Sequence, residues 1–599
     1  MGRITGINKS SNISRNVTYD EFDRVNGLTL SLLGKNITSA VLYGDFGQVN
    51  SFTNTIGDKT DTISYTYDDF YRVKSRNLNG MEESTEYTYL KGQNGQDTTL
   101  VESFYNSKDT YSYTYDVYGN ILTVSKGGVL LERYTYDSLH RLTKVTKGSD
   151  VYTYTYDAGG NITSVKKNGV SVKEYSYGDN SWSDRLTSFN GTNINYDEIG
   201  NPLNWRNNMT LSWEYGRRLK TVTADGNDIS YTYDADGLRT SKTVNGVKTE
   251  YYWLDGVLQG QKTGSEYIIF LYDENGTAYG MLINQNGVEN YYYYLFNLQG
   301  DIVGIMDSSG NTVAEYTYDA WGQLLTDQDT LANTIGGKNP LRYRGYYYDS
   351  ETGFYYLKSR YYDPYVQRFI NADGYVSTGQ GILGNNMFAY CNNNPVSRKD
   401  TSGQGWITAI VITVVATVTA VVAKNHMIAQ KNKKANSKVD SNSKTTTKNK
   451  LINDQNGDTG ENFKYGRYSA SWNACETIAV HNAKVLNGIE SSLSETMYDF
   501  QMAGAMPLYG VLGSNPYAIG TVLNKSNIDY SRVGLDEITN PGTYIISYWT
   551  GPFPSSIHTV AISYDGSVYT TYNLYGDNKT YNDNPTDYAE RYICGYYLR

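Results

Sequence analysis

The stretch YSYTYDVYGNILTVSKGG, residues 111–128, decides the fold that this sequence predicts. At its start tyrosine alternates with serine or threonine, which is the period of a β-strand with one buried face. Asp116, Gly119 and Asn120 follow, and these residue types are typical of a turn. A second apolar run comes next, so the stretch predicts a hairpin of two strands.

The same unit recurs along the first part of the chain. A Y-T-Y-D sequence, or a worn version of it, returns every 18 to 26 residues, which indicates a repeat architecture. Because two strands cannot bury their own aromatic face, neighbouring units must stack, and we expect the tyrosines to pack between them. The alternative is that the tyrosines form a carbohydrate-binding surface. The repeat positions are Tyr19, Tyr43, Tyr67, Tyr89, Tyr115, Tyr136, Tyr156, Tyr177, Tyr196, Tyr215 and Tyr233.

Composition excludes several classes of protein. The net charge of −10 comes from 52 basic and 62 acidic residues spread along the chain, so no nucleic-acid partner is expected from charge. The three cysteines, Cys391, Cys475 and Cys594, lie far apart and form no C-x-x-C pair, which argues against a disulfide scaffold or a zinc site. No H-E-x-x-H, P-loop or G-x-S-x-G motif is present, and we expect no cofactor.

The repeats resemble the YD repeats of RHS proteins. The segment PLRYRGYYYDSETGFYYLKSRYYDPYVQRFINADGY, residues 340–375, resembles the RHS repeat-associated core. The resemblance implies a β-strand shell wound around a cavity, a core that plugs one end, and a variable C-terminal toxin. It also implies a cognate immunity protein as partner, secretion or display at the cell surface, and delivery of the toxin into a target cell. The first residues lack the apolar core of a signal peptide, so we expect the chain to be the C-terminal part of a longer protein.

The expected fold class is mainly β, with a YD-repeat β-solenoid shell, a core plug, a hydrophobic segment and a small α+β papain-like domain. The expected domains are the shell over residues 1–330, the core over 331–404, the hydrophobic segment and linker over 405–450, and the effector over 451–599.

The sequence NNNPVSRKDTSGQG, residues 392–405, lies where RHS proteins carry the self-cleavage sequence N-P-x-x-x-x-D-P-x-G. Asp400 and Gly403 match it, whereas threonine replaces the second proline. The resemblance implies aspartyl-protease-like cleavage after Gln404, with Arg360 and Asp373 as the remaining members of the site. Two carboxylates can do this chemistry if they share protons unequally. The alternative is that Asp-Thr-Ser-Gly is an ordinary turn.

An uncharged run of 18 residues, 406–423, follows the core. It is at the lower limit for a membrane-spanning helix, and its valines and threonines also suit a buried β-structure. The lysines that follow favour transient membrane contact. Residues 436–450 are almost entirely Ser, Thr, Asn and Lys, which predicts a linker.

In the C-terminal domain, ACETIAVHNAKVLNG, residues 474–488, predicts a helix that Ser471 or Asn473 could cap. Cys475 then lies in the first turn, where the helix dipole favours a thiolate. His481, six residues later, points away from this thiol.

A second histidine opens HTVAISYDGSVYTTYN, residues 558–573, in which Asp565-Gly566 predicts a two-residue hairpin turn. That turn would pair His558 with Asn573 across the hairpin. A Cys475-His558-Asn573 triad could then attack an amide or thioester, with His558 as general base and Asn573 orienting its ring. The alternative is a buried cysteine and a structural histidine, which is how we interpret Cys391 and Cys594.

The order Cys, His, Asn resembles papain-like peptidases, especially bacteriocin-processing peptidases and papain-fold toxins. These carry a glutamine before the cysteine, which is missing here, so Asn473 or Ser471 are the oxyanion candidates. The resemblance implies a cysteine peptidase-like hydrolase or acyl transferase acting on a protein or peptide. The alternatives are an RHS toxin with another effector, such as a nuclease or deamidase, and a non-enzymatic glycan-binding adhesin.

Overall fold

The computed structural model describes residues 6–374 apart from 11–12, 21–23, 45–47, 70–71, 79–82, 93–96, 327 and 333. It further describes residues 386–408 apart from 401 and 404–405, and residues 436, 448–452, 463–465, 468–469, 474–502, 518–549, 557–572 and 592–598. The chain divides into two compact units. The first comprises Met1–Leu42 and Val49–Ala416, and the second comprises Tyr43–Gln48 and Thr417–Arg599.

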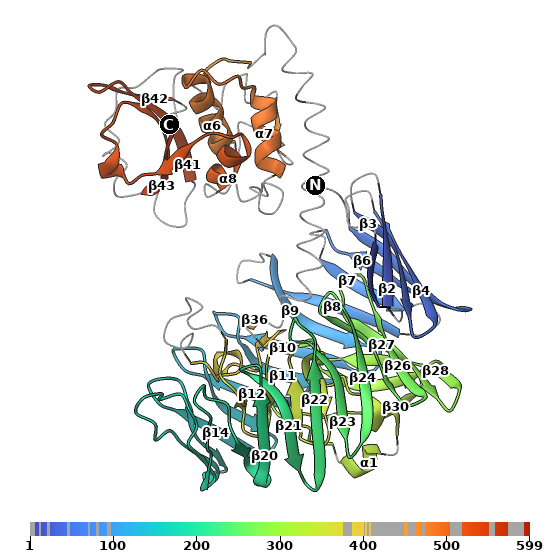
Figure 1. Ribbon diagram of the computed structural model, residues 1–599. Coiled ribbons are helices and arrows are strands. Elements are labelled where there is room, and N and C mark those ends of the chain that lie inside the picture. The colour runs from blue at the N-terminus through green and yellow to red at the C-terminus, as the bar shows by residue number, and fades with distance from the viewer. Residues whose placement is uncertain are drawn as a thin grey trace. The chain divides into compact units, whose positions relative to one another are not determined.

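Two long antiparallel sheets form most of the first unit (Figure 1), and in each of them strands that are consecutive in sequence pair with one another. The first sheet has 18 strands and the second has 12. The strands of the first sheet are β1 Gly6–Ser10, β2 Ile13–Tyr19, β3 Val25–Leu32, β4 Lys35–Tyr43, β5 Val49–Ile56, β6 Lys59–Tyr67, β7 Val73–Leu78, β8 Glu83–Lys91, β9 Asp97–Asn106, β10 Thr110–Tyr115, β11 Ile121–Lys126, β12 Val129–Tyr136, β13 Leu142–Lys147, β14 Asp150–Tyr156, β15 Ile162–Lys167, β16 Val170–Ser176, β17 Ser188–Phe189 and β18 Thr192–Asn193. Those of the second are β19 Asn204–Trp205, β20 Met209–Glu214, β21 Arg218–Ala224, β22 Asn227–Tyr233, β23 Arg239–Val244, β24 Val247–Leu254, β25 Val257–Thr263, β26 Glu266–Tyr272, β27 Ala278–Gln285, β28 Val288–Phe296, β29 Ile302–Asp307 and β30 Thr312–Glu315.

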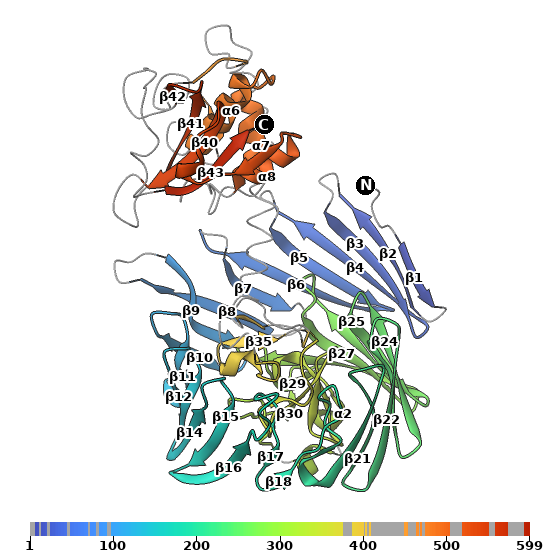
Figure 2. The same ribbon diagram turned by 60° about the vertical axis from the view of Figure 1, so that its left-hand side comes forward.

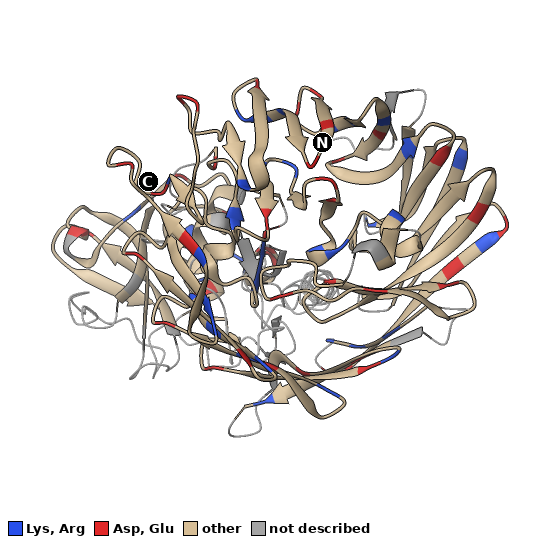
Figure 3. Cartoon of the chain, turned by 90° about the horizontal axis from the view of Figure 1, so that it is seen from below, with Lys and Arg blue, Asp and Glu red and all other residues tan. Residues whose placement is uncertain are grey.

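The predicted hairpin unit is confirmed, but the predicted solenoid is not seen among the described residues. Tight turns join consecutive strands, which therefore run antiparallel in a meander, whereas a solenoid winds its chain in successive coils. In Figure 2 the two sheets curve on either side of the core segment. Basic and acidic residues are interspersed along the strands in Figure 3.

The Tyr-Asp pair at the end of each unit has a definite structural task. Tyr115 donates a hydrogen bond of 2.7 Å from its hydroxyl to the carbonyl of Val101 in the preceding unit. Asp116 accepts the backbone N–H of Asn120 at 2.9 Å and so closes the turn. Gly119 has a φ of +81°, which a residue without a Cβ adopts at no steric cost. The tyrosine thus links units while the aspartate shapes the turn.

The same tyrosine bond recurs along both sheets, so the packing interpretation of these tyrosines is confirmed. Tyr215 is an exception to the prediction: it is 82% exposed, and Trp213 takes its place by donating from Nε1 to the carbonyl of Pro202 at 2.7 Å. The recurring bonds are Tyr67 to Val49, Tyr89 to Val73, Tyr136 to Ile121, Tyr156 to Leu142, Tyr177 to Ile162, Tyr196 to Leu186, Tyr233 to Leu219, Tyr272 to Leu258 and Tyr318 to Ile302.

Replacing Tyr115 by phenylalanine is expected to lower the free energy of unfolding by about 1 kcal/mol, because the buried Val101 carbonyl loses its partner. Urea unfolding followed by tryptophan fluorescence measures the change. Tyr215→Phe, which alters an exposed ring, is the control and should change stability by less than about 0.5 kcal/mol. Equal effects of the two substitutions would contradict the linking role.

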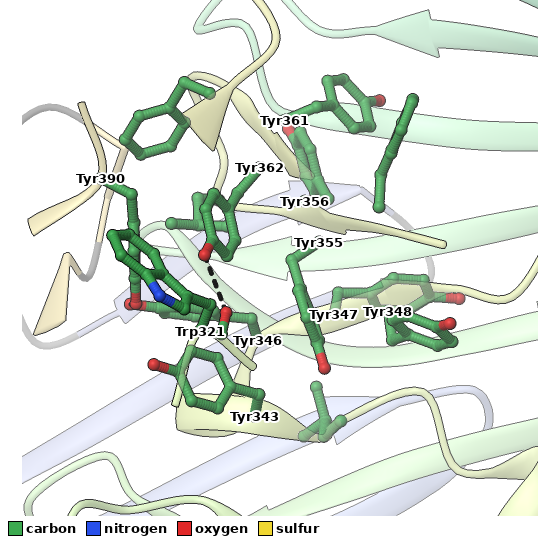
Figure 4. Close-up of a cluster of buried hydrophobic side chains, with 14 of the residues drawn as sticks. Trp321, Tyr343, Tyr346, Tyr347, Tyr348, Tyr355, Tyr356, Tyr361, Tyr362 and Tyr390 are labelled. Atoms are coloured by element: carbon green, nitrogen blue, oxygen red, sulfur yellow. Dashed lines mark hydrogen bonds between the residues drawn. The ribbon is translucent and has the colours of Figure 1, made fainter. Parts of the chain in front are cut away.

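The core segment follows β30 and packs mostly aromatic side chains. Its described elements are α1 Gln328–Ala332, α2 Ile335–Lys338, β31 Tyr347–Asp349, β32 Phe354–Tyr356, β33 Tyr361–Asp363, β34 Arg368–Phe369, β35 Arg398–Asp400 and β36 Trp406–Thr408. Figure 4 shows the buried cluster, in which Tyr362 donates to the carbonyl of Trp321 at 2.7 Å. Tyr355 stacks on Tyr362, and Tyr362 stacks on Tyr390 with ring centroids 4.0 Å apart. The cluster joins the core to the shell.

A buried ion cluster also joins them. Arg239 of β23 binds both carboxylate oxygens of Asp349 in β31, at 2.6 and 3.2 Å, and neither side chain is more than 1% exposed. Lys242 contacts Asp349 at 3.0 Å and Glu351 at 2.8 Å. Burial alone would raise the pKa of Asp349, but Arg239 and Lys242 hold it below its usual value. The carboxylate therefore stays ionised inside the protein.

Only the first three residues of the predicted hydrophobic run 406–423 are described, and they form β36, which pairs with β35. The remainder of that run and most of the linker lie outside the described residues. In the part of the chain that the structure covers, no helix has both the length and the apolar character needed to cross a membrane.

The second unit packs helices on a five-stranded sheet ordered β39-β43-β40-β41-β42. Its core contains Ile478 and Ala479 from a helix together with Ile545 and Ala561 from the sheet. Its described elements are β37 Lys464–Tyr465, β38 Tyr468–Ser469, α6 Cys475–Leu486, α7 Leu493–Met502, α8 Ala518–Lys525, β39 Tyr530–Arg532, β40 Gly542–Trp549, β41 Ile557–Tyr564, β42 Tyr569–Tyr572 and β43 Tyr592–Leu598.

Candidate self-cleavage centre and effector site

Three parts of the core converge on Arg360, which lies between β32 and β33. Its Nη2 is 2.9 Å from Oδ2 of Asp373, shortly after β34, and 3.6 Å from Oδ2 of Asp400, at the end of β35. The three side chains are 5%, 12% and 3% exposed. The structure therefore brings together three of the predicted self-cleavage residues around one nitrogen.

The remaining donors of Arg360 hold the surrounding backbone. Nε donates to the carbonyl of Gly403, and Nη1 donates to the carbonyl of Met387 at 2.9 Å. The guanidinium also lies 3.6 Å from the ring centre of Phe369. Burial lowers the pKa of Arg360 and the two aspartates oppose that shift, so the side chain keeps its positive charge at neutral pH.

Asp400 fixes the chain just before the expected cut. Its Oδ1 accepts the backbone N–H groups of Ser402 at 3.1 Å and Gly403 at 2.8 Å. Gly403 has a φ of +76°, and a Cβ on it would come within 2.6 Å of Oγ of Ser359. Gln404 lies outside the described residues.

This arrangement can do more than close a turn. The bonds from Asp400 to Ser402 and Gly403 are those of an ordinary Asp-initiated turn, as the simpler interpretation expects. That turn does not require Asp373 or a buried arginine. Two neighbouring carboxyl groups can divide the roles of base and acid when only one of them is ionised.

In the second unit, α6 begins at Cys475 as predicted, but its cap differs. The N-cap is Ala474, and no side chain caps the helix. The oxyanion and cap candidates Ser471 and Asn473 lie outside the described residues. Cys475 contacts the Thr559 backbone of β41, and this contact lowers its pKa slightly.

The expected thiolate is not supported by the surroundings of Cys475. Burial raises the pKa of this thiol well above its ordinary value, and the carboxylate of Glu476 raises it further. The thiol donates to Oε2 of Glu476 at 3.1 Å. Burial and a neighbouring negative charge thus outweigh the helix dipole, and sequence reasoning missed Glu476 although it directly follows the cysteine.

His558 is buried on β41, where its ring lies edge-on to Tyr548 with centroids 5.9 Å apart. Alternate residues of a strand point to opposite faces, so His558 shares the face of Val560. Val560 packs in a cluster separate from the one in which Ala561 contacts α6. By strand alternation, His558 therefore belongs to the face away from α6.

The predicted register of the His558 hairpin is wrong. Tyr564 pairs with Tyr569, and Ala561 pairs with Tyr572, so the connection is a four-residue loop rather than a two-residue Asp-Gly turn. The wider loop forms because Oδ1 of Asp565 accepts the N–H of Val568 at 2.8 Å. The described ladder ends at Ala561 and Tyr572, and Asn573 itself lies outside the described residues.

The other residues singled out from the sequence are structural. His481 faces Oγ of Ser491 at 2.9 Å and the carbonyl of Lys450 at 2.8 Å, away from Cys475 as expected. Cys391 and Cys594 are buried and form no disulfide among the described residues, and burial raises the pKa of each.

Similar proteins are found for a large part of the chain. Residues 129–396 match the family model "Teneurin YD-shell". The chain is 36% identical over 234 residues to "tRNA3(Ser)-specific nuclease WapA" of Bacillus spizizenii, which is 38% of this chain and 10% of that protein. It is 26% identical over 264 residues to "Double-stranded DNA deaminase toxin A" of Burkholderia cenocepacia, which is 37% of this chain and 17% of that protein. The chain therefore spans only a small part of the length of these relatives.

Solved structures share the fold. "Crystal Structure of TcdB2-TccC3-Cdc42" matches 69% of this chain and 22% of the other, with 19% identity and a TM-score of 0.54. "Crystal Structure of TcdB2-TccC3 without hypervariable C-terminal region" matches 66% of this chain and 22% of the other, with 20% identity and the same TM-score. The second structure lacks its hypervariable C-terminal region, so its similarity to this chain does not depend on that region.

Proposed function

We propose, from the premise that this chain carries a YD-repeat shell of the RHS type, that it is a secreted toxin which cuts itself after Gln404 and releases an enzymatic effector. The observation that carries this proposal is the convergence of Asp373 and Asp400 on Arg360, next to the carbonyl of Gly403. A cognate immunity protein is the expected partner.

In the proposed cleavage, one carboxylate takes a proton from water as the oxygen attacks the carbonyl carbon of Gln404. The other carboxyl donates its proton to the nitrogen of Gly405 as the peptide bond breaks. The Arg360 guanidinium contacts both carboxyl groups, and its bond to the Gly403 carbonyl holds the chain in place. Thr401 stands where the resemblance expects proline, so the turn relies on the bonds that Asp400 makes.

For the effector, residues 451–599, we propose an enzyme that acts on nucleic acid. The names of the relatives, a tRNA nuclease and a DNA deaminase toxin, support this class. Their support is indirect, because the matched stretches are longer than the whole effector segment and therefore extend outside it. This proposal replaces the expectation from charge that no nucleic acid is bound.

A cysteine peptidase-like hydrolase acting through Cys475, His558 and Asn573 is the second candidate. The position of Cys475 in the first turn of α6, beside the backbone of Thr559, favours it. The raised pKa of Cys475 speaks against it, since the thiolate is the nucleophile.

Expression of residues 451–599 inside bacteria separates these candidates, because the segment has a core of its own. The expected result is growth arrest with degraded tRNA or deaminated DNA, retained in Cys475→Ala. Cys594→Ala, which alters another buried thiol of the same unit, is the matched control. Loss of toxicity in Cys475→Ala alone would favour the peptidase, and a harmless segment would favour the adhesin.

A further inference from the structure

A cavity of about 470 Å³ opens between the two sheets and the core, within the first unit. Tyr87 and Phe104 of the first sheet line it, as do Tyr294 and Phe296 of the second. Lys399 of β35 lines it from the core. Its volume and its mostly apolar lining are those of a small-molecule site.

Lys399 is the unusual member of this lining. Within the described part of the chain its Nζ forms no hydrogen bond or ion pair. The residue is only partly exposed, and the cations Arg344 and Lys358 act on it. Burial lowers the pKa of Lys399 to about 8, and Arg344 and Lys358 lower it further against the opposing effect of Asp301. A partly buried ammonium gains when an anion pairs with it, so this part of the lining favours a negatively charged group.

The carboxylate of Asp301 does not serve as this partner, because it is already paired with Arg344. Arg344 is already held by Asp301 at 3.2 Å and by the carbonyl of Gln299 at 3.0 Å. Arg76, another cation of the lining, lies 4.0 Å from the carboxylate of Asp273, which also lines the cavity. Because Arg344 and Arg76 already have carboxylate partners, an anion in the cavity would direct its charge toward Lys399.

We propose that this cavity binds an amphipathic carboxylate, whose apolar part lies between the aromatic walls and whose carboxylate pairs with the ammonium of Lys399. Such a pair is a charge-assisted hydrogen bond, which is stronger than a neutral one. The carboxylate belongs either to a free organic acid or to an acidic residue of a peptide.

Dansylglycine, a fluorescent aromatic carboxylate, tests the proposal in the full chain. Binding to the wild type is expected to weaken at least 10-fold in Lys399→Met and less than 3-fold in Lys399→Arg. Lys220→Met, which alters an exposed lysine outside the cavity, is the control and should not change binding. Thr85→Trp, which enlarges another residue of the lining, should weaken binding without altering Lys399.

The pH dependence gives an independent readout. Between pH 7.5 and 9.5 the wild type should lose affinity at least 5-fold as Lys399 loses its proton, whereas Lys399→Arg should not. The other groups that act on Lys399 are Arg344, Lys358, Asp301 and Cys391. Arginine and aspartate do not titrate in this range, and burial raises the pKa of Cys391 above it. Burial lowers the pKa of Lys358 from its ordinary value, and because Lys399→Arg retains Lys358, that variant reports any contribution of Lys358.

A competing peptide, acetyl-Phe-Asp-amide, distinguishes the two sources. If the peptide displaces dansylglycine at a lower concentration than phenylbutyrate does, the site is assigned to a peptide. The reverse order assigns it to a free acid. Equal binding by the wild type and Lys399→Met, with both proteins folded by circular dichroism, would overturn the proposal. So would the absence of dansylglycine binding to the wild type.

Discussion

Replacing Asp400 by asparagine is expected to leave the chain uncut, whereas the wild type separates after Gln404. The substitution keeps the size of the side chain and an oxygen that can accept from Ser402 and Gly403, so the turn is retained. It removes the carboxylate that shares Arg360 with Asp373. General acid–base catalysis contributes about 10²- to 10⁴-fold, so cleavage should slow by at least about 100-fold.

Intact-mass spectrometry of the purified chain over time measures this rate and identifies the new C-terminus. Asp373→Asn should have a similar effect, because the mechanism requires both carboxyl groups. Asp307→Asn is the matched control, since Asp307 accepts the backbone N–H groups of Ser309 and Asn311 in a comparable but exposed turn, and it should cleave at the wild-type rate. An uncut wild type, or Asp400→Asn cleaving as fast as the wild type, would exclude the mechanism.

Replacing Arg239 by methionine is expected to lower the free energy of unfolding of the first unit by about 3–5 kcal/mol. The substitution leaves Asp349, which is fully buried, with Lys242 as its remaining cation. It also removes the guanidinium from the rings of Tyr356 and Tyr251, whose centres lie 4.5 and 4.8 Å from Cζ. Guanidinium unfolding, followed by tyrosine and tryptophan fluorescence, measures the loss.

Lys248→Met, which breaks an exposed pair with Glu250, is the control and should cost less than about 1 kcal/mol. The double variant Arg239→Met with Asp349→Leu should recover much of the loss, because no uncompensated charge is left inside. If Arg239→Met alone is as stable as the wild type, the cluster does not join core to shell.

The repeat strands could be predicted from sequence because their signals are local. Tyr115, Asp116 and Gly119 lie within five residues and act within one unit and its predecessor. The sequence did not predict that Trp213 takes the role expected of Tyr215. The two aromatic residues are two positions apart, and the turn after β20 determines which of them faces inward. The start of α6 at Cys475 was likewise a local signal.

The candidate sites were predictable only in part. Arg360, Asp373 and Asp400 were expected from a resemblance, and the structure adds their geometry and the bond to Gly403. The His558 register failed because the side chain of Asp565 stabilises a wider loop than its neighbour Gly566 suggests. The pairing of Arg239 with Asp349 joins residues 110 positions apart, and no local sequence pattern predicts it.

Most of the described repeat tyrosines bond to a carbonyl one unit back, which bears on how such proteins change in length. When recombination duplicates or deletes a whole unit, the tyrosine hydroxyls and carbonyls that bond between neighbouring units keep hydrogen-bond partners. Bonds across the interior, such as that of 2.8 Å from Tyr293 to Asp61, are the ones that such an edit would misalign. Contacts between the two sheets therefore limit how far either sheet can be lengthened alone, and matched additions to both sheets are the route by which evolution can enlarge the shell.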